Sequence, residues 1–377
     1  MRLLALIPGI LIVVLTLVDV FEVVVLPRRV ERAFRFARVY YQGTWRFWRS
    51  FVRLMPTGES QEPLLALYGP LSLIGLLAMW AGGLVVGYAI LYWADGNISQ
   101  GFGPHSGFAR DLYYSGTTFF TLGLGDVSPR SAGTRAITVL EVANGLAFLA
   151  LVIGYLPIFY QSFSRRENII SLLDGRAGSP PTAGELLHRL RHDPIELRRT
   201  LREYERWAAD LLESHLSYAV LMFFRSQHER QSWVATLTAI LDVSSIVMVR
   251  GGDVDASAAQ LTFAMARHAA VDLSDVFERA PTIPDDDRLE LDFDRLTALL
   301  ADVPFLRDVD PLGIELESLR TTYEPYVAAL SRYLLMPLPR WVPAPDAVDD
   351  WQTSRVDPEA FGLADPIPDR LVRKGRE

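Results

Sequence analysis

The chain has 377 residues, half of them hydrophobic, and carries a formal net charge of −8. Residues 1–162 hold 12 arginines against 9 acidic residues, whereas residues 163–377 hold 25 basic against 36 acidic residues. This uneven balance predicts a near-neutral membrane part joined to an acidic soluble part, and it argues against nucleic acid as a partner. The absence of cysteine excludes disulfides, thiolate metal sites and cysteine nucleophiles.

The N-terminal segment, residues 1–26, is a long apolar run from residue 3 to residue 26 in which Asp19 and Glu22 are the only charged residues. We predict a retained transmembrane helix rather than a signal peptide, because the run is too long and Asp19 and Glu22 replace a small-residue cleavage site. These carboxylates lie three residues apart on one helical face, so we expect both to avoid lipid. We favour pairing with Arg28, Arg29 or another arginine at the inner surface; a proton or voltage sensor is the alternative.

A basic linker, residues 27–62, follows this first span. Aromatic residues suited to the lipid headgroup level alternate with its arginines, which predicts an amphipathic helix at the cytoplasmic interface. Anionic-lipid binding and voltage sensing are the sharper alternatives, although the segment is too polar for a voltage-sensor span. The arginines are Arg28, Arg29, Arg32, Arg35, Arg38, Arg46, Arg49 and Arg53.

Residues 63–162 combine two apolar spans with a glycine-containing loop. The spans are predicted at 64–93 and 134–160, with a helix too short to cross a membrane at 107–120. Between them lies Thr-Leu-Gly-Leu-Gly-Asp, in which Gly123 and Gly125 tolerate unusual backbone angles. A loop that replaces the water around K⁺ must present a ring of backbone carbonyls and therefore needs such angles.

The short helix, the loop and the following span together resemble the pore domain of potassium channels, whose signature reads Thr-Val-Gly-Tyr-Gly-Asp. The resemblance covers about residues 64–160. It implies a homotetramer in which Thr121, Leu122, Gly123, Leu124 and Gly125 form the selectivity filter, with K⁺ held at the first four. Gly145 stands twenty residues after Gly125, at the spacing of the inner-helix hinge in that family, and Pro157 marks a second bend.

Three positions near the filter depart from the family pattern. Leu124 stands where the signature has tyrosine and cannot hydrogen-bond to the pore helix, which keeps a weakly selective cation channel open as an alternative. Tyr113 and Tyr114 replace a common tryptophan pair, and Thr117 lies where some bacterial channels place a glutamate. The resemblance implies that these residues and Asp126 support the filter, with Tyr113 donating a hydrogen bond to Asp126.

The arginine distribution predicts the orientation in the membrane. The linker at 27–62 holds eight arginines, whereas the loop at 95–133 holds only Arg110 and Arg130. Because positive loops stay inside, the linker and the C-terminal part should be cytoplasmic, with the N-terminus and the filter mouth outside. We therefore expect a multi-pass protein of the cell's inner, or plasma, membrane.

Residues 163–335 predict a helical cytoplasmic domain, followed by a proline- and aspartate-rich tail at 336–377. Neither a dinucleotide-binding glycine motif nor a β-roll pattern occurs, so its ligand cannot be named. Helices are expected at 185–216, with a start at Asp193-Pro194, and at 216–224, 233–249, 256–277, 285–300 and 315–335.

The sequence as a whole predicts an all-α membrane channel with three spans, a re-entrant pore helix and a helical cytoplasmic domain. The leading hypothesis is a potassium-selective channel that this domain regulates and that needs no cofactor besides the permeant K⁺. A non-conducting membrane receptor with a channel-like fold is an alternative. No nucleophile–base pair, metal cluster or phosphate-binding loop is recognisable, so we do not expect an enzyme.

Overall fold

The computed structural model describes residues 2–26, 36–55, 61–99, 107–228, 231–251, 256–276, 288–306 and 314–344. Within these residues all regular elements are helices, as predicted, and the only extended pairings are two isolated bridges. The chain forms two compact units. The first comprises Met1–Phe163 and His215–Arg225, and the second comprises Ser164–Ser214 and Ser226–Glu377.

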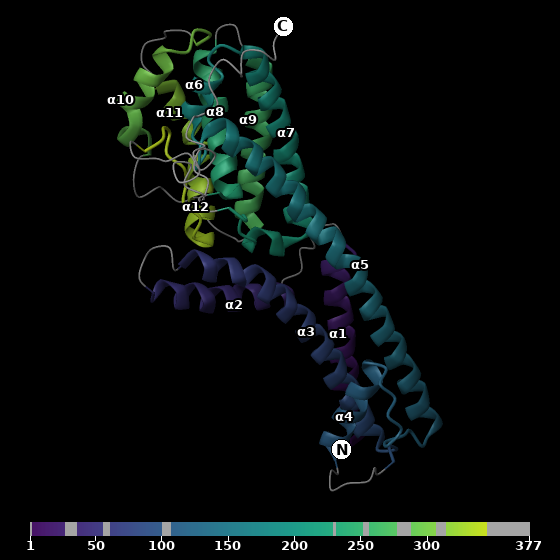
Figure 1. Ribbon diagram of the computed structural model, residues 1–377. Coiled ribbons are helices and arrows are strands. Elements are labelled where there is room, and N and C mark those ends of the chain that lie inside the picture. Colours follow the sequence, from purple (N-terminus) through teal and green to yellow (C-terminus); the bar gives the residue numbers. More distant parts are fainter. Residues whose placement is uncertain are drawn as a thin grey trace, which may run out of the picture. The chain divides into compact units, whose positions relative to one another are not determined.

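The first unit holds the N-terminal apolar helix, the outer helix and the pore helix. Helix α1 packs lengthwise on α3, and a Cβ at Gly87 would lie 2.7 Å from Val13, so glycine permits close helix packing here. Helix α3 in turn packs on α4 (Figure 1). The elements are η1 (Arg2–Ala5), α1 (Leu6–Val24), α2 (Phe36–Arg53), α3 (Gln61–Asp95), α4 (Phe108–Phe119), the first part of α5 (Ala132–Ala177), and η2 (Ala219–Phe223).

The two carboxylates of α1 are buried, as expected. Asp19 accepts hydrogen bonds from the Trp80 indole at 2.8 Å and from the Ala37 backbone amide at 3.3 Å. Ala37 lies in the first turn of α2, where the helix dipole favours a negative charge. Both Asp19 oxygens therefore have a donor among the described residues. The arginine pairing favoured from the sequence stays a prediction, because Arg28 and Arg29 lie outside the described residues.

The basic linker forms helix α2, which runs antiparallel to the first turns of α3 (Figure 1). The Trp48 indole donates to the Leu64 carbonyl at 3.1 Å, and the Tyr40 hydroxyl donates to the Ser72 carbonyl at 3.0 Å. Protein rather than lipid thus covers much of its aromatic side. Among the linker arginines, Arg38, Arg46 and Arg53 are exposed and Arg49 is partly buried. Arg28, Arg29, Arg32 and Arg35 lie outside the described residues.

Helices α1, α3 and α5 are long and apolar enough to span a membrane, as predicted. Helix α8 (Trp233–Arg250) also qualifies by length and composition, but 89% of its apolar window is buried inside the protein, so we assign it to a soluble core. Helix α5 is longer than predicted and continues past residue 160 to Ala177. Ile170, Leu173 and Ala177 are buried at helical spacing in this extension.

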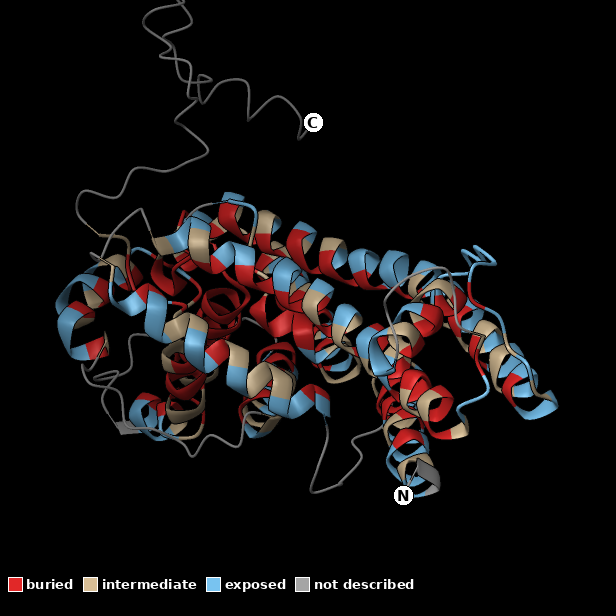
Figure 2. Cartoon of the chain, turned by 90° about the horizontal axis from the view of Figure 1, so that it is seen from below, coloured by how far each residue is buried: buried red, intermediate tan, exposed pale blue. Residues whose placement is uncertain are grey.

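The second unit surrounds α8 with helices, and buried residues gather in its interior (Figure 2). Side chains cap several helix starts: the Asp193 carboxylate accepts the Glu196 amide at 2.9 Å, and Ser232 accepts the Ala235 amide at 3.0 Å. Its other helices are α6 (Ala183–Arg189), α7 (Pro194–Ser217), α9 (Ala256–Val276), α10 (Arg288–Ala301), α11 (Ile314–Arg320) and α12 (Glu324–Leu334).

Residues 185–216 fall into α6 and α7, and α7 starts at Asp193-Pro194 as predicted. Two other helix predictions for this part were wrong in their extent. Residues 315–335 fall into α11 and α12, and Pro325 lies in the first turn of the second helix. The segment at 216–224 holds only the short 3₁₀ helix η2, and it belongs to the first unit rather than to the second. In the tail, residues 336–344 have no regular secondary structure, and residues 345–377 lie outside the described part.

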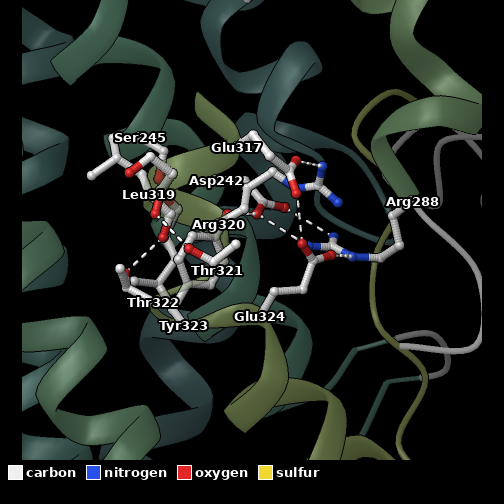
Figure 3. Close-up of polar contacts among 12 residues, drawn as sticks. Asp242, Ser245, Arg288, Glu317, Leu319, Arg320, Thr321, Thr322, Tyr323 and Glu324 are labelled. Atoms are coloured by element: carbon white, nitrogen blue, oxygen red, sulfur yellow. Dashed lines mark hydrogen bonds and ion pairs between the residues drawn. The ribbon is translucent and has the colours of Figure 1, made fainter. Parts of the chain in front are cut away.

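A cluster of buried charged side chains connects helices of the second unit (Figure 3). Asp242 of α8 is fully buried and accepts hydrogen bonds from Arg288 at 3.0 Å and from the Tyr323 hydroxyl at 2.6 Å. Glu324 pairs with Arg288 at 2.9 Å and with Arg320 at 2.8 Å. Burial alone would lower the pKa of Arg288, but Asp242 and Glu324 outweigh it and hold that pKa above its ordinary value. The cluster joins α8, α10, α11 and α12 and is internally paired, so we assign it a structural role.

Candidate functional site

The pore loop, residues 120–126, follows pore helix α4 and has an alternating backbone conformation. Thr121, Gly123 and Gly125 have φ values of +57°, +54° and +79°, whereas φ at Leu122 and Leu124 is not positive. Among the described non-glycine residues, only Thr121 and Leu335 have positive φ. In an extended strand successive carbonyls point to opposite sides, whereas alternating left- and right-handed residues favour successive peptide groups that point the same way. The alternation of positive and non-positive φ along the loop thus favours carbonyls that point to one side.

The N-terminal half of the loop is tied to the end of α4. The Leu122 and Gly123 amides donate to the Thr117 carbonyl at 2.8 and 3.4 Å. The Thr117 hydroxyl donates to the Tyr114 carbonyl at 2.9 Å within its own helix. Thr117 thus lies beside the loop, as the sequence suggested, but contacts it through its backbone rather than its side chain.

The C-terminal end of the loop is anchored to the chain that leaves α3. Val127 is buried in the core of the first unit, and Ile98 forms an isolated antiparallel bridge with Pro129. The amide of Ser99 donates to the Ser128 carbonyl at 2.9 Å in this bridge. The exposed residues 121–126 are thereby held between two fixed ends.

The two tyrosines of the pore helix point to different neighbours. The Tyr113 hydroxyl donates to the Asp126 carboxylate at 3.0 Å, so the hydrogen bond implied by the resemblance is present at the exposed mouth. Tyr114 is buried, its hydroxyl lies 3.0 Å from the Thr138 hydroxyl on α5, and its ring packs edge-on against Tyr92. Tyr114 therefore joins the pore helix to the inner and outer helices, and its support of the loop stays a prediction.

Replacing Tyr113 with phenylalanine removes this hydrogen bond and keeps the ring. Because Leu124 offers no polar group of its own, we expect Tyr113→Phe to increase inactivation or Na⁺ leak while assembly stays intact. Single-channel recording of the variant measures both properties. Unchanged selectivity and unchanged inactivation would rule out the bracing role.

Gly145 lies where inner helix α5 meets the end of the pore helix. A Cβ at Gly145 would lie 2.2 Å from the Phe119 carbonyl oxygen, a contact that neither backbone can accommodate in place. Glycine is thus required for close packing, independently of the hinge role that the sequence suggested. Pro157 lies inside α5 and is exposed, and its missing amide removes one helical hydrogen bond there. The two hinge roles stay predictions.

A buried carboxylate behind the pore helix was missed from the sequence. Glu141 of α5 is fully buried; it accepts the Tyr92 hydroxyl of α3 at 2.6 Å and is hydrogen-bonded to Ser115 of α4. The Ser115 hydroxyl also contacts the Val85 carbonyl at 2.8 Å. Glu141 therefore joins inner, outer and pore helices at one point. The available signal was a lone acidic residue within an apolar span, which by default marks a functional position.

Removing this junction should loosen the pore helix. Glu141→Ala leaves the buried hydroxyls of Tyr92 and Ser115 without their acceptor and opens a cavity, so we expect about 2–5 kcal/mol of destabilisation and reduced flux. Glu141→Gln keeps the shape of the side chain and can hydrogen-bond to both hydroxyls. It should therefore retain most of the stability and most of the flux. Thermal unfolding in detergent and flux measured on the same preparations compare the variants. If the Glu141→Ala protein is as stable as the Glu141→Gln protein and conducts as well, the hydrogen bonds of Glu141 do not matter.

Comparison with known proteins agrees with this geometry. Residues 76–162 match the model of a family described as "Ion channel", a range that holds most of α3, all of α4 and the pore loop, and α5 up to the end of its apolar part. Over 245 residues the chain is 26% identical to the membrane protein YdjJ of Bacillus subtilis (strain 168), covering 60% of this chain and 69% of that protein. No solved structure matches the chain. Residues 76–162 therefore form an ion channel pore domain within an all-helical membrane protein.

Proposed function

We propose that the chain is the subunit of a potassium-selective channel with Thr121–Leu122–Gly123–Leu124–Gly125 as its filter. The alternation of positive φ at Thr121, Gly123 and Gly125 is the observation that carries the proposal. It supports the assignment of the carbonyls of Thr121, Leu122, Gly123 and Leu124 as the ligands that would replace the water around K⁺. Asp126 at the exposed mouth adds a negative charge that attracts cations.

The filter requires four chains, because one loop supplies a quarter of a carbonyl ring. In the single chain Leu122 and Leu124 are 61% and 63% exposed, and only 11% of the apolar window of α5 is buried, against 44% for α3. These surfaces fit a homotetramer in which four inner helices and four loops surround one axis.

The proposed setting is the plasma membrane, with the N-terminus outside and the second unit in the cytoplasm. The arginine-rich linker supports this orientation. Arg38, Arg46 and Arg53 are exposed on α2, which supports contact with anionic lipid headgroups at the inner surface as part of this proposal.

Flux across liposomes tests conduction itself. Purified protein, whose assembly should contain four chains of 42.3 kDa, is reconstituted into K⁺-loaded vesicles. K⁺ efflux through the protein supports the proposal. A tetramer without efflux would favour the non-conducting receptor, and a conducting monomer or dimer would contradict the shared filter.

We also propose that the second unit regulates the pore through a latch formed by residues 218–225, which connect α7 to the chain before α8. Although both neighbouring helices extend into the second unit, the latch itself belongs to the first. Val220, Leu221, Met222 and Phe223 are all buried there. A movement of α7 would therefore pull on a segment packed inside the membrane unit.

The latch contacts the inner helix around Pro157. Its Tyr218 ring packs on Tyr155 with centroids 5.5 Å apart, and its Phe224 ring packs on Phe159 at 5.0 Å and on Phe163 at 5.7 Å. These inner-helix residues lie on both sides of Pro157, where α5 lacks one hydrogen bond.

The latch also contacts the two helices that lie outside the inner helix. Phe223 packs on Trp45 of α2 at 5.2 Å and on Tyr68 of α3 at 5.1 Å, and a Cβ at Gly69 would lie 2.7 Å from Phe224. Arg225 is buried and pairs with Glu62 at 3.3 Å. The latch thereby ties the proposed bend to the outer helices, a contiguous network of the kind that carries coupling.

Weakening the latch should free the inner helix. We expect Phe224→Ala to raise K⁺ flux by about fivefold or more, since couplings of this kind are typically about 1–3 kcal/mol. Leu261→Ala removes an exposed leucine from α9 of the second unit and should leave flux unchanged. Flux and assembly are measured on the same preparations. A Phe224→Ala tetramer with wild-type flux would contradict the latch.

A further inference from the structure

The first unit contains a groove between helix α2 and the first turns of α3, which run side by side (Figure 1). Its volume of about 490 Å³ is in the range of roughly 300–1,000 Å³ that small-molecule sites occupy. Val39, Phe47 and Leu71 line the groove and are 52%, 74% and 49% exposed. Apolar surface gathered in this way marks a place where the protein binds something.

The polar side chains that line the groove are hydrogen-bonded within the protein. Tyr40 and Trp48 donate to backbone carbonyls of α3 at 3.0 and 3.1 Å. The hydroxyls of Thr44 and Tyr68 are hydrogen-bonded to each other at 2.9 Å, and the Ser72 hydroxyl donates to a carbonyl of its own helix at 2.8 Å. Because these groups already have partners, the groove offers hydrocarbon contacts and suits an apolar chain.

Gly43 lines the groove and leaves space that the packing of the protein does not use. A Cβ at Gly43 would meet no atom within 4 Å, whereas a Cβ at Gly75 of α3 would lie 2.2 Å from the Tyr40 hydroxyl. Glycine is less favourable than alanine inside a helix, so close packing explains Gly75 but not Gly43. Val39 and Phe47 stand four residues before and after Gly43 on the same helical face. The missing side chain therefore opens a gap in an apolar stripe, where a bound chain can lie.

One edge of the groove is basic. Helix α2 contains four arginines and no acidic residue. Arg46 is exposed and stands three residues after Gly43, so it lies beside the groove. Arg53 is exposed two turns further along the same face as Arg46. An apolar groove with a basic edge matches an amphiphile that has an anionic head and an apolar chain.

We propose that the groove binds one acyl chain of an anionic phospholipid, with the headgroup against Arg46. Helices α1, α3 and α5 are long and apolar enough to span a membrane, so phospholipid is the amphiphile that surrounds this part of the protein. The proposal rests on the proposed position of α2 at the inner membrane surface and names its partner there. Tyr68 lines the groove and packs on Phe223 of the latch at 5.1 Å, so the bound chain lies next to the segment that contacts the inner helix. The binding requires no ion flux and can be tested apart from conduction.

Photocrosslinking of the full-length protein in phosphatidylcholine nanodiscs tests the site. The probe is phosphatidylglycerol with a photoactivatable diazirine in one acyl chain, added at a low mole fraction, and mass spectrometry locates the labelled residues. We expect more label on Phe47 and Leu71 than on Leu54, which follows α2, is 86% exposed and lies outside the groove. The same diazirine chain on a phosphatidylcholine headgroup should label the groove about fivefold less, because it lacks the negative charge that Arg46 attracts.

Three variants separate the groove from the rest of α2. Gly43→Trp places an indole in the open space at Gly43, so labelling of the groove should fall to the level at Leu54. Gln42→Trp introduces the same side chain one residue earlier, on a face of α2 that does not line the groove, and should leave labelling unchanged. Arg46→Ala should lower labelling by the phosphatidylglycerol probe about fivefold. The assembly of each variant is measured on the same preparations.

Four results would overturn the proposal. Equal labelling of the groove and of Leu54 would show an ordinary lipid-facing surface, and equal labelling by the two probes would show that the headgroup does not matter. Equal labelling of the Gly43→Trp and Gln42→Trp proteins would place the lipid elsewhere, and absence of label in the groove would show that a neighbouring chain covers it. Efflux is measured separately: a lipid site without efflux contradicts only the proposed conduction, and efflux without the lipid site contradicts only this inference.

Discussion

Replacing Gly123 with alanine is expected to reduce K⁺ flux to the background of protein-free vesicles. Gly123 has φ of +54°, a conformation that costs an L-residue with a Cβ roughly 1–2 kcal/mol in each chain. No other atom lies within 4 Å of the added Cβ in the single chain, so the expected loss comes from backbone strain rather than from a clash there. Four strained loops on one axis would turn their carbonyls away from the ion path.

Gly116→Ala is the matched control for this change. Gly116 lies in pore helix α4, its added Cβ also meets no atom within 4 Å, and its φ is not positive. Alanine is favoured over glycine inside a helix, so assembly and flux should be retained. If Gly123→Ala conducts K⁺ with normal selectivity, residues 121–125 are not the filter.

Replacing Gly145 with alanine is expected to disrupt the pore domain itself. The added Cβ would lie 2.2 Å from the Phe119 carbonyl oxygen, so the end of the pore helix must move away from α5. Overpacking of this kind typically costs about 1–3 kcal/mol, occasionally more, and here four pore helices would shift. We expect a lower unfolding temperature, fewer tetramers and little flux.

The same substitution separates close packing from a hinge. A hinge glycine replaced by alanine would change gating while leaving the unfolding temperature of the tetramer near that of the wild type. Gly154→Ala serves as the control, because Gly154 lies in the same helix and no atom lies within 4 Å of its added Cβ. If Gly145→Ala and Gly154→Ala unfold at the same temperature, the packing explanation is wrong.

Features that depend on neighbouring residues in the sequence were predictable. The positive φ at Gly123 and Gly125 follows from the loop sequence, the start of α7 follows from Asp193-Pro194, and the three spans follow from runs of apolar residues. The hydrogen bond between Tyr113 and Asp126 was accessible only through the resemblance to potassium channels, since spacing alone does not fix it.

Features that depend on distant residues were not predictable. Asp19 is bound by Trp80, sixty-one residues away, and the sequence shows the carboxylate but not its partner. The segment before α8 returns to the first unit, which its apolar sequence does not distinguish from an ordinary core helix. The contacts of Glu141 likewise arise from the packing of three helices.

The reversal potential of single channels between K⁺ on one side and Na⁺ on the other tests the central claim most directly. A carbonyl filter at residues 121–125 predicts a reversal potential close to that of K⁺ alone, because Na⁺ is poorly coordinated there. Leu124 replaces the tyrosine of the potassium-channel signature, so selectivity for K⁺ over Na⁺ is the property that most needs to be measured. A reversal potential near zero, with both ions carrying current, would contradict potassium selectivity and establish a weakly selective cation pore.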